Sequence, residues 1–319
     1  MEHHWRNSIK LTNELSIRGN SVAADYTGFE IPERGIFFDA GIATHRIASL
    51  IAITHCHADH ICNINKILTN FIGSEGNKKE NNKVTILVPA SRGKRNTAEL
   101  LRNHINSFFQ LNMCTNSTNI NKYIDIVEMR GLSEELSKKK KKKMIAAGIE
   151  LKDEEPSTFE ITLSNTLYVF EAIDCYHSVP TISYLLSHKK NKLKREYAEL
   201  SREEIITLKK QKIKVDEIRK EPVMAFICDS SILVLEKNPH VFEYPIVMIE
   251  CTFILPEDVD EAVKKRHIHW LHLEPYVKKY PNIKFILFHF SSKHKADQIN
   301  AFFEIQKKNG IENVSTITL

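Results

Sequence analysis

The stretch IAITHCHADH, residues 51–60, places four metal-binding side chains directly after an apolar run: His55, His57, Asp59 and His60. Side chains two residues apart in an extended backbone point to the same side, so the first two histidines face one point. The chain then turns into a helix, which directs the other two side chains toward a second point. One such residue alone usually has a structural role, but four within six positions favour a metal site. Imidazole and carboxylate ligands suit Zn²⁺ and similar ions, so the stretch predicts two metal ions.

Five apolar segments of the chain are each followed by a histidine or an acidic residue. These are SLIAIT before His55, VFEAIDCY before His177, VMAFIC before Asp229, PIVMI before Glu250, and KFILF before His289. In layered α/β folds, ligands bind beyond the carboxyl ends of the strands. Each of His177, Asp229 and His289 has an ordinary structural interpretation when taken alone. As a set at strand ends, they favour one shared metal site.

The composition is that of a folded protein, and it restricts the function only weakly. The chain has 319 residues, of which 42% are hydrophobic, enough for one large domain or two smaller ones. The net charge of +5 permits a nucleic acid as partner without requiring one. We expect no membrane span, because no apolar run reaches about eighteen residues. The N-terminus lacks a secretory apolar segment, and the scattered cysteines form no C-x-x-C pair, so we expect reduced thiols inside the cell.

Strand-like and helix-like segments alternate along the chain, which predicts a layered α/β fold. A hairpin is predicted from FEITL (159–163) and TLYVFEAIDCY (166–176), joined at Ser164–Asn165. Helices are predicted at 97–111, around 257–279 and at 293–309, and the strongly charged region 188–220 also has a helical pattern with a capping box at Ser201 and Glu204. We interpret the lysine run 138–143 as a solvated loop.

Several motifs resemble those of a known family. THCHADH (54–60) matches the H-x-H-x-D-H motif of the metallo-β-lactamase fold, a four-layered αββα sandwich that supports many chemistries. Three later segments narrow the resemblance to tRNase Z (ribonuclease Z). ICDSS (227–231) resembles its G-D-T segment, IECTF (249–253) its H-E-A-T segment, and FHFSSKH (288–294) its H-F-S-x-R-Y segment. The resemblance covers nearly the whole chain and looks closest to the short, plant-type forms.

The resemblance implies roles for individual residues. One metal ion would be held by His55, His57 and His177, and the other by Asp59, His60 and His289, with Asp229 as the bridge. Glu250 and His267 would form the family's acid pair, with His269 and His272 as nearby alternatives to His267. Asp39, in FFDAG, would orient a ligand histidine.

These roles imply phosphodiester hydrolysis. Water activated by two metal ions would attack the phosphorus 3′ of the tRNA discriminator nucleotide, with Asp59 taking a proton and His267 protonating the leaving 3′-oxygen. The products would be a tRNA with a 3′-OH and a trailer with a 5′-phosphate. We expect two Zn²⁺ ions per chain, with Mn²⁺ or Mg²⁺ as alternatives.

The chain departs from the family pattern near the site. Cys62 and Asn63 stand where glycines are common, Cys228 replaces the glycine before Asp229, and Lys293–His294 replaces Arg-Tyr. None of these changes removes a ligand. No loop resembling P-x-K-x-R-N is found, so discrimination of the CCA end stays open.

Residues 188–220 are predicted to be an inserted arm on a single domain spanning 1–319. In the family this insertion grips the tRNA, and basic clusters contact phosphates without reading sequence. An ordinary solvated helix pair is the alternative, because several glutamates dilute the charge. The candidate RNA-binding residues are Lys189, Lys190, Lys192, Lys194, Arg195, Lys209 and Lys210.

The sequence therefore predicts an endoribonuclease that acts on precursor tRNA. The alternatives are another phosphodiesterase or small-ester hydrolase of the same fold, and a non-enzymatic RNA-binding descendant. By resemblance to the short forms we expect a homodimer, located in the cytoplasm with the nucleus as the alternative.

Overall fold

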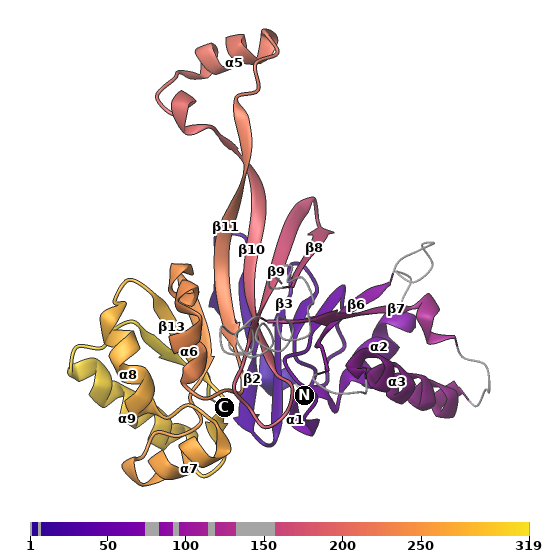
Figure 1. The fold of residues 1–319 in the computed structure, drawn as a ribbon, viewed down its shortest axis with the longest axis vertical. Coiled ribbons are helices and arrows are strands. Elements are labelled where there is room, and N and C mark those ends of the chain that lie inside the picture. The colour runs from indigo at the N-terminus through magenta and orange to yellow at the C-terminus, as the bar shows by residue number, and fades with distance from the viewer. Residues whose placement is uncertain are drawn as a thin grey trace, which may run out of the picture.

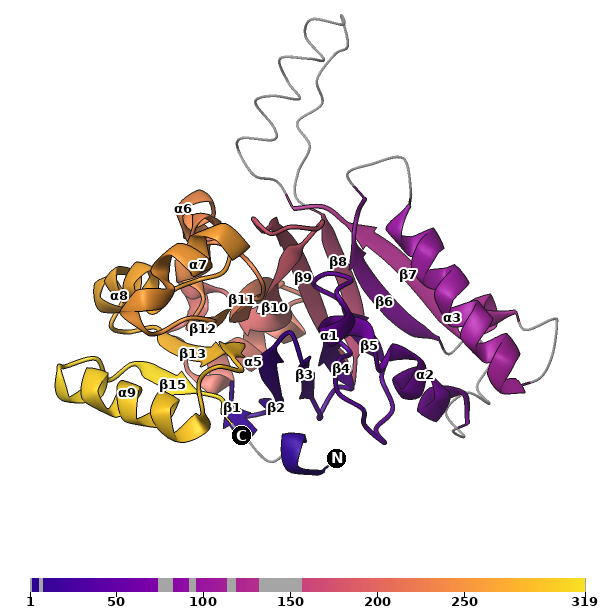
Figure 2. The same cartoon turned by 90° about the horizontal axis from the view of Figure 1, so that it is seen from below.

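Two β-sheets pack face to face in a computed structural model of the chain, and helices cover the outer face of each sheet (Figures 1 and 2). The structure describes residues 2–5, 8–73, 83–91, 96–113, 119–131 and 157–318. The lysine run 138–143 lies outside these residues. The layered α/β sandwich expected from the sequence is confirmed.

The first sheet is built mainly from the N-terminal half of the chain. Its strand order is β1-β2-β3-β4-β5-β6-β7, antiparallel from β1 to β4 and parallel from β4 to β7, and β14 pairs with β2. The strands are β1 (Ser8–Lys10), β2 (Ser16–Ala23), β3 (Tyr26–Ile31), β4 (Ile36–Phe38), β5 (Leu50–Ala52), β6 (Val84–Pro89), β7 (Ile124–Met129) and β14 (Phe290–Ser291). The accompanying helices are α1 (Ala58–Ile61), α2 (Ile64–Ile72) and α3 (Thr97–Met113).

The second sheet has the order β15-β13-β12-β11-β10-β9-β8, antiparallel from β8 to β11 and parallel beyond. Its strands are β8 (Thr158–Leu163), β9 (Thr166–Asp174), β10 (Ile182–Leu193), β11 (Asp216–Ile227), β12 (Ile246–Glu250), β13 (Lys284–Phe288) and β15 (Val314–Thr316). The accompanying helices are α6 (Leu233–Lys237), α7 (Val259–Lys265), α8 (Trp270–Lys279) and α9 (Ala296–Lys308). Among the described helices, none has the length and apolar character needed to cross a membrane.

Aromatic rings join the two sheets at the centre of the molecule. Phe38 of the first sheet stacks on Phe226 of the second with ring centroids 4.6 Å apart, and Phe226 stacks on Phe288 at 5.3 Å. Phe29 meets Phe288 edge to face at 5.1 Å. All four side chains are fully buried. Helices cover the outer face of each sheet, so the central strands are buried on both faces. Their sequences are therefore continuous apolar runs without polar alternation.

The charged region 188–220 is strand at its two ends and helical only between them, so the helical prediction was wrong for the residues that belong to β10 and β11. β10 and β11 extend as an antiparallel ribbon that leaves the body of the molecule, with Leu193 paired to Asp216 at its far end (Figure 1). Only the tip is helical, in η4 (Arg195–Tyr197) and α5 (Arg202–Lys210). A two-stranded ribbon surrounded by solvent buries neither of its faces. Its sequence therefore lacks the alternation of apolar and polar residues by which a half-buried strand is recognised. The capping box predicted at Ser201 and Glu204 is confirmed.

The helix predicted around 257–279 is divided into α7 and α8. α7 ends at Lys265 and is followed by Arg266, which has a left-handed backbone. α8 begins after His269, whose side chain accepts a hydrogen bond from the Leu271 N–H. This break places His267 in the loop between the two helices. Its imidazole is therefore presented by a turn and not by a helix face.

The stacked phenylalanines generate the first prediction. Phe226→Ala removes the ring that contacts both sheets and leaves a cavity between them, so the free energy of unfolding falls by about 3–5 kcal/mol. Ile305→Ala is the matched control, because that side chain is 55% exposed on α9 and its loss costs no more than about 0.5 kcal/mol. Urea denaturation of both variants measures the difference, and equal losses would contradict the packing described here.

Candidate metal centre

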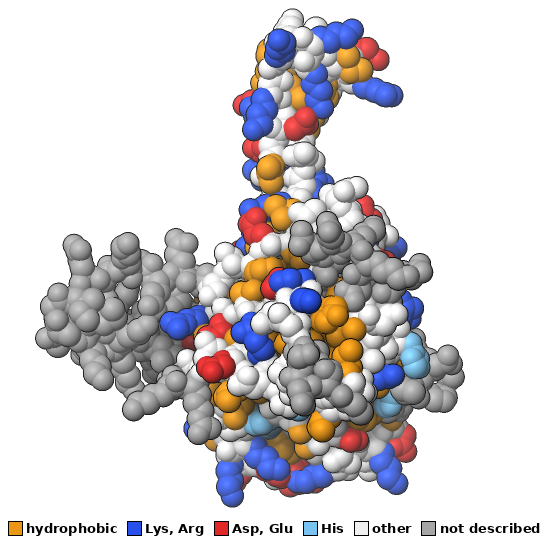
Figure 3. Space-filling model, turned by 90° about the vertical axis from the view of Figure 1, so that its right-hand side faces the viewer, with side chains coloured by type: hydrophobic (Ala, Val, Ile, Leu, Met, Phe, Trp, Pro, Cys, Tyr) orange, Lys and Arg blue, Asp and Glu red, His pale blue; other side chains and the backbone are white. Residues whose placement is uncertain are grey.

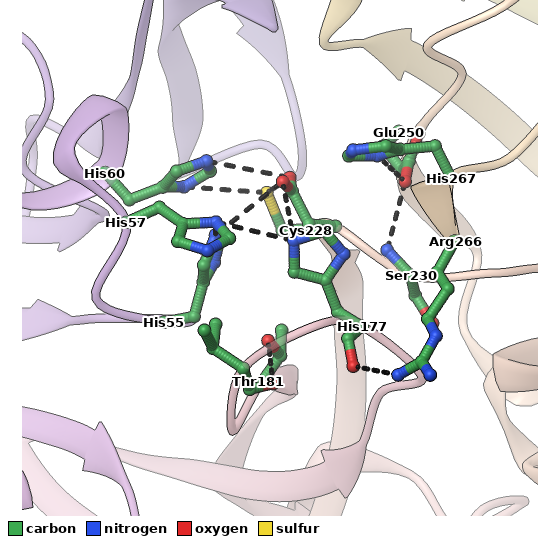
Figure 4. A network of polar contacts seen from close by, with 12 residues as sticks. His55, His57, His60, His177, Thr181, Cys228, Ser230, Glu250, Arg266 and His267 are labelled. Carbon is green, nitrogen blue, oxygen red and sulfur yellow. Dashed lines mark hydrogen bonds and ion pairs between the residues drawn. The ribbon is translucent and has the colours of Figure 1, made fainter. Parts of the chain in front are cut away.

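The strand-end residues converge at one edge of the sandwich. His55 and His57 lie in the loop after β5, and Asp59 and His60 lie in the short helix α1 that follows. From the second sheet come His177 after β9, Asp229 after β11 and His289 after β13. Figure 4 shows His55, His57, His60 and His177 directed toward one another. All seven residues predicted as ligands are brought together here.

One group of ligand atoms surrounds the Oδ2 atom of Asp229. His55 Nε2 lies 3.6 Å from this oxygen and His177 Nε2 lies 3.7 Å from it. His57 Nδ1 is 2.9 Å from His55 Nε2 and 3.4 Å from His177 Nε2. Tetrahedral ligands bound at about 2.0–2.2 Å are separated from one another by roughly 3.3–3.6 Å. Three of these spacings lie within about 0.1 Å of that range, and the separation of His55 Nε2 from His57 Nδ1, 2.9 Å, is shorter.

A second group faces the other carboxylate oxygen of Asp229. His289 Nε2 lies 3.2 Å from Oδ1 and His60 Nε2 lies 3.6 Å from it. Asp59 Oδ2 completes the group, 3.3 Å from His60 Nε2 and 3.8 Å from His289 Nε2. Asp229 thus presents one oxygen to each group, which is the arrangement a bridging carboxylate needs.

Hydrogen bonds on the outer side of three rings fix their tautomers. His60 Nδ1 donates to Asp39 Oδ2 at 2.8 Å. The Thr54 hydroxyl donates to Asp39 and therefore accepts from His55 Nδ1 at 3.1 Å. The Nε2 atom of each ring is then left with its lone pair facing the cluster, as a metal ligand requires.

Thr252 orients His289 in the same way. Its hydroxyl donates to Glu250 Oε2 at 2.6 Å, so it accepts from His289 Nδ1 at 3.2 Å. The sequence interpretation missed Thr252 and Thr54, although both lie inside quoted motifs. Asp39 stands where it was expected, against a ligand histidine.

The hydrogen bonding and protonation of the side chains test whether metal ions would fit here. His60 Nε2 and His289 Nε2 are buried and make no well-directed hydrogen bond within the described structure. Burial, the largest influence, lowers the pKa values of His55, His57 and His177, so their neutral, ligating forms are favoured. Burial alone would raise the pKa of Asp229, but the surrounding histidines lower it well below its usual range. The donor set is therefore suited to two divalent cations.

Glu250 and His267 form a hydrogen-bonded pair beside this cluster. Glu250 Oε1 accepts from His267 Nδ1 at 2.8 Å and from the Ser230 N–H at 3.0 Å. Burial lowers the pKa of His267, but Glu250 outweighs it and raises that pKa to about 9. The His267 ring centroid lies 5.0 Å from that of His177 and 5.6 Å from that of His289. The pair is close enough to the cluster to act on the same bound group.

His269 and His272, the alternatives to His267, lie apart from the cavity lining. His269 is buried, its Nε2 donates to the Leu255 carbonyl at 2.8 Å, and its Nδ1 caps α8. Neither residue lines the cavity of about 860 Å³ that opens onto the cluster. That cavity is lined by ligands and His267, and on one side by Lys264, Lys265, Arg266 and Lys293.

The residues that depart from the family pattern make specific contacts in the structure. The Asn63 amide donates to the Gly41 carbonyl at 2.8 Å and so ties the start of α2 to the loop after β4. A Cβ atom at Gly41 would lie 1.8 Å from the Asp59 carbonyl oxygen, so this close approach requires glycine. The Cys228 thiol donates to Asp229 Oδ1 at 3.3 Å. Lys293 pairs with Glu261 at 2.5 Å on α7.

Most of the arm lysines are engaged in ion pairs, so their charge is partly compensated. The pairs are Lys189 with Glu160 (2.5 Å), Lys190 with Glu14 (3.2 Å), Lys192 with Glu221 (3.0 Å), Lys194 with Glu196 (3.5 Å) and Lys209 with Asp216 (2.9 Å). Arg195 and Lys210 make no ion pair with any described residue. Figure 3 shows basic, acidic and apolar side chains mixed over the arm.

Comparison with known proteins identifies relatives along nearly the full chain. The sequence is 26% identical over 288 residues to tRNase Z TRZ1 of Arabidopsis thaliana, which covers 89% of this chain and 88% of that protein. The chain resembles tRNase Z. It is also 23% identical over 314 residues to the chloroplastic tRNase Z TRZ2 of the same plant, covering 95% of this chain and 75% of TRZ2. No protein-family model matches the chain.

Two solved structures of tRNase Z are similar to this chain over most of its length. The short form of human tRNase Z is 15% identical, with a TM-score of 0.48, covering 86% of this chain and 91% of that one. A long-form yeast RNase Z has the same identity and TM-score but is covered over only 35% of its length. At these values the structural similarity carries no information about function. The motifs and the sequence relatives together agree with the metallo-β-lactamase fold expected from the sequence.

The position of Asp229 generates the second prediction. Asp229→Asn keeps the shape of the side chain but removes the charge shared by the two ligand groups, so affinity for divalent metal falls by at least about 100-fold. Equilibrium dialysis followed by metal analysis measures this. Asp260→Asn is the control, because Asp260 is an exposed carboxylate on α7. Unchanged metal affinity in the Asp229 variant would rule out the bridging role.

Proposed function

We propose that the chain is a metal-dependent endoribonuclease that removes the 3′ trailer from precursor tRNA. The observation that carries the proposal is the presentation of one Asp229 oxygen to each ligand group, beside the Glu250–His267 pair. The similarity to proteins named tRNase Z supplies the substrate class. Another phosphodiesterase or a small-ester hydrolase of this fold remains the alternative, but these relatives do not favour it.

The metal ions would be Zn²⁺, two per chain, held by the two ligand groups described above. When bound, such a pair holds a phosphate, lowers the pKa of a water molecule and stabilises negative charge on the attacking and leaving oxygens. Neutral imidazoles and carboxylates are ligands that Zn²⁺ prefers, although Mn²⁺ and Mg²⁺ accept carboxylates as well.

The residues of the chain would handle the protons. Asp59 Oδ2 accepts from the Ala24 N–H at 3.1 Å, which holds this carboxylate at the cavity where it can take the proton of the attacking water. His267 Nδ1 is engaged with Glu250, so its Nε2 is left to protonate the departing 3′-oxygen. In-line displacement places the attacking and leaving oxygens on opposite sides of the phosphorus. The discriminator ribose would therefore lie on the His267 side of the cavity.

Cleavage of a precursor tRNA with mapped ends tests the proposal. The metal-loaded protein should cut once, directly 3′ of the discriminator, and leave a 3′-OH. His57→Ala, which removes a metal ligand, is the inactive control. Turnover of bis(p-nitrophenyl) phosphate with an intact precursor would instead establish the alternative.

The general-acid role generates the third prediction. His267→Ala lowers kcat for precursor tRNA by about 10²–10⁴-fold, because the leaving 3′-oxygen is strongly basic and needs a proton. Bis(p-nitrophenyl) phosphate loses much less, because p-nitrophenolate departs without protonation. Steady-state kinetics on both substrates measure the ratio. Equal losses would assign His267 to the metal site and exclude the acid role.

The arm would contact the RNA at a distance from the cut. Ion-paired lysines can exchange a carboxylate for a phosphate, and Arg195 and Lys210 need no exchange. The contact would be electrostatic and independent of base sequence.

Removal of the arm tip generates the fourth prediction. Residues 194–215 are replaced by Asn-Gly, which closes the ribbon between the paired residues Leu193 and Asp216 with a two-residue turn. KM for precursor tRNA rises by about tenfold or more at physiological salt, while turnover of bis(p-nitrophenyl) phosphate is unchanged. An unaltered KM would show that the arm tip has no part in binding.

The resemblance to the short forms of tRNase Z is also the basis for proposals on the oligomeric state and the cellular compartment. We propose a homodimer, as in the short forms, acting in the cytoplasm or the nucleus. Light scattering of the purified protein tests the first point, and a mass of one chain would refute it.

A further inference from the structure

Arg266 stands at a position in the fold where glycine is the usual residue. It follows α7 with φ 60° and ψ 46°, in the left-handed region. Its own N–H donates to the Val263 carbonyl at 3.2 Å, and the N–H of His267 donates to the Ala262 carbonyl at 2.9 Å. These two bonds define a Schellman motif, whose left-handed residue is most often glycine because a Cβ is disfavoured there. The backbone of this turn therefore gives no reason for an arginine.

The side chain of Arg266 gives that reason. Its Nη1 donates to the backbone carbonyl of His177 at 2.9 Å, as Figure 4 shows. His177 lies in the loop after β9 and its ring belongs to the first ligand group. The bond joins this loop to the turn carrying His267, a residue distant in sequence. The two histidine rings lie with centroids 5.0 Å apart.

This bond is a direct link between the turn that carries His267 and the loop that carries His177. Glu250 restrains the His267 ring through one nitrogen, but it reaches the His177 loop only by way of Ser230, whose N–H donates to Glu250 and whose hydroxyl accepts from the Tyr176 N–H. Proton transfer depends on the position of the donor relative to the leaving oxygen, and that oxygen is fixed by the phosphate held at the ligands. The Arg266 bond connects these two positions directly.

We propose that Arg266 is a positioning residue, whose guanidinium bond to the His177 carbonyl sets the general acid His267 against the metal-held phosphate. The inference rests on the proposed phosphodiesterase chemistry. It assigns Arg266 an effect on the departure of the leaving group, and not on metal binding or on affinity for RNA.

Arg266→Gly tests this, because glycine suits the left-handed backbone and the variant should fold at least as well as the wild type. Its thermal midpoint and metal content should equal or exceed those of the wild type. kcat for precursor tRNA should fall by about 10–100-fold with KM unchanged, while bis(p-nitrophenyl) phosphate stays within about threefold. Guanidinium ion added at millimolar concentration should restore part of the lost rate. Lys278→Ala is the control for loss of one positive charge, since Lys278 pairs with Glu274 on α8 and does not line the cavity.

Diphenyl phosphate makes the test independent of the natural substrate, because phenolate is a poorer leaving group than p-nitrophenolate. Arg266→Gly should slow diphenyl phosphate more than bis(p-nitrophenyl) phosphate, even if precursor tRNA proves not to be cleaved. Equal losses on both esters, or a fall in metal content, would overturn the positioning role. A rise in KM for precursor tRNA alone would also overturn it, by making Arg266 a contact to RNA.

Discussion

The candidate site depends on one buried carboxylate shared between two sets of imidazoles. Asp229 lies at the end of β11, only 3% exposed, with His55 and His177 near one oxygen and His60 and His289 near the other. Burying a lone carboxylate is costly, so its charge must be compensated by neighbours. Here those neighbours come from both sheets. Compensation of this carboxylate therefore requires both sheets, and the stacked phenylalanines pack between those sheets.

Strained backbone surrounds this carboxylate. Asp39, His289, Ala24 and Arg266 all have φ near +60°, although none of them is glycine. Each such residue costs about 1–2 kcal/mol, and the surrounding structure must over-determine it. Asp39 is held by its hydrogen bond with the ligand His60, and His289 is held by its hydrogen bond with Thr252. At Asp39 and His289, the strain thus lies where a side chain leaves a strand end to reach the ligand cluster.

The sequence predicted the parts of this site that follow from strand ends. A histidine or acid directly after an apolar run has a defined place once the sheets are layered, so His177, Asp229 and His289 could be assigned a common edge. The arm could not be predicted in the same way, because a solvent-exposed ribbon buries no face. Arg266 left no signal either, since its role depends on a left-handed turn and on a backbone carbonyl of a distant loop. The ion pairs of the arm lysines likewise depend on partners far away in the sequence, such as Glu14 and Glu160.

The arm and the metal centre are parts of one strand. β11 runs from Asp216, at the far end of the ribbon, to Ile227, two residues before Asp229, with one register shift in its pairing to β10. At about 3.3 Å per residue, its twelve residues span roughly 40 Å. Pairing with β10 supports this strand from Asp216 to Phe226, on both sides of that register shift. The distance from the tip to the shared carboxylate is therefore set by the sheet and not by a flexible linker. An RNA held at the tip would be presented to the cavity at a fixed separation, so the folded shape of the RNA, more than its sequence, would decide which phosphate reaches Asp229.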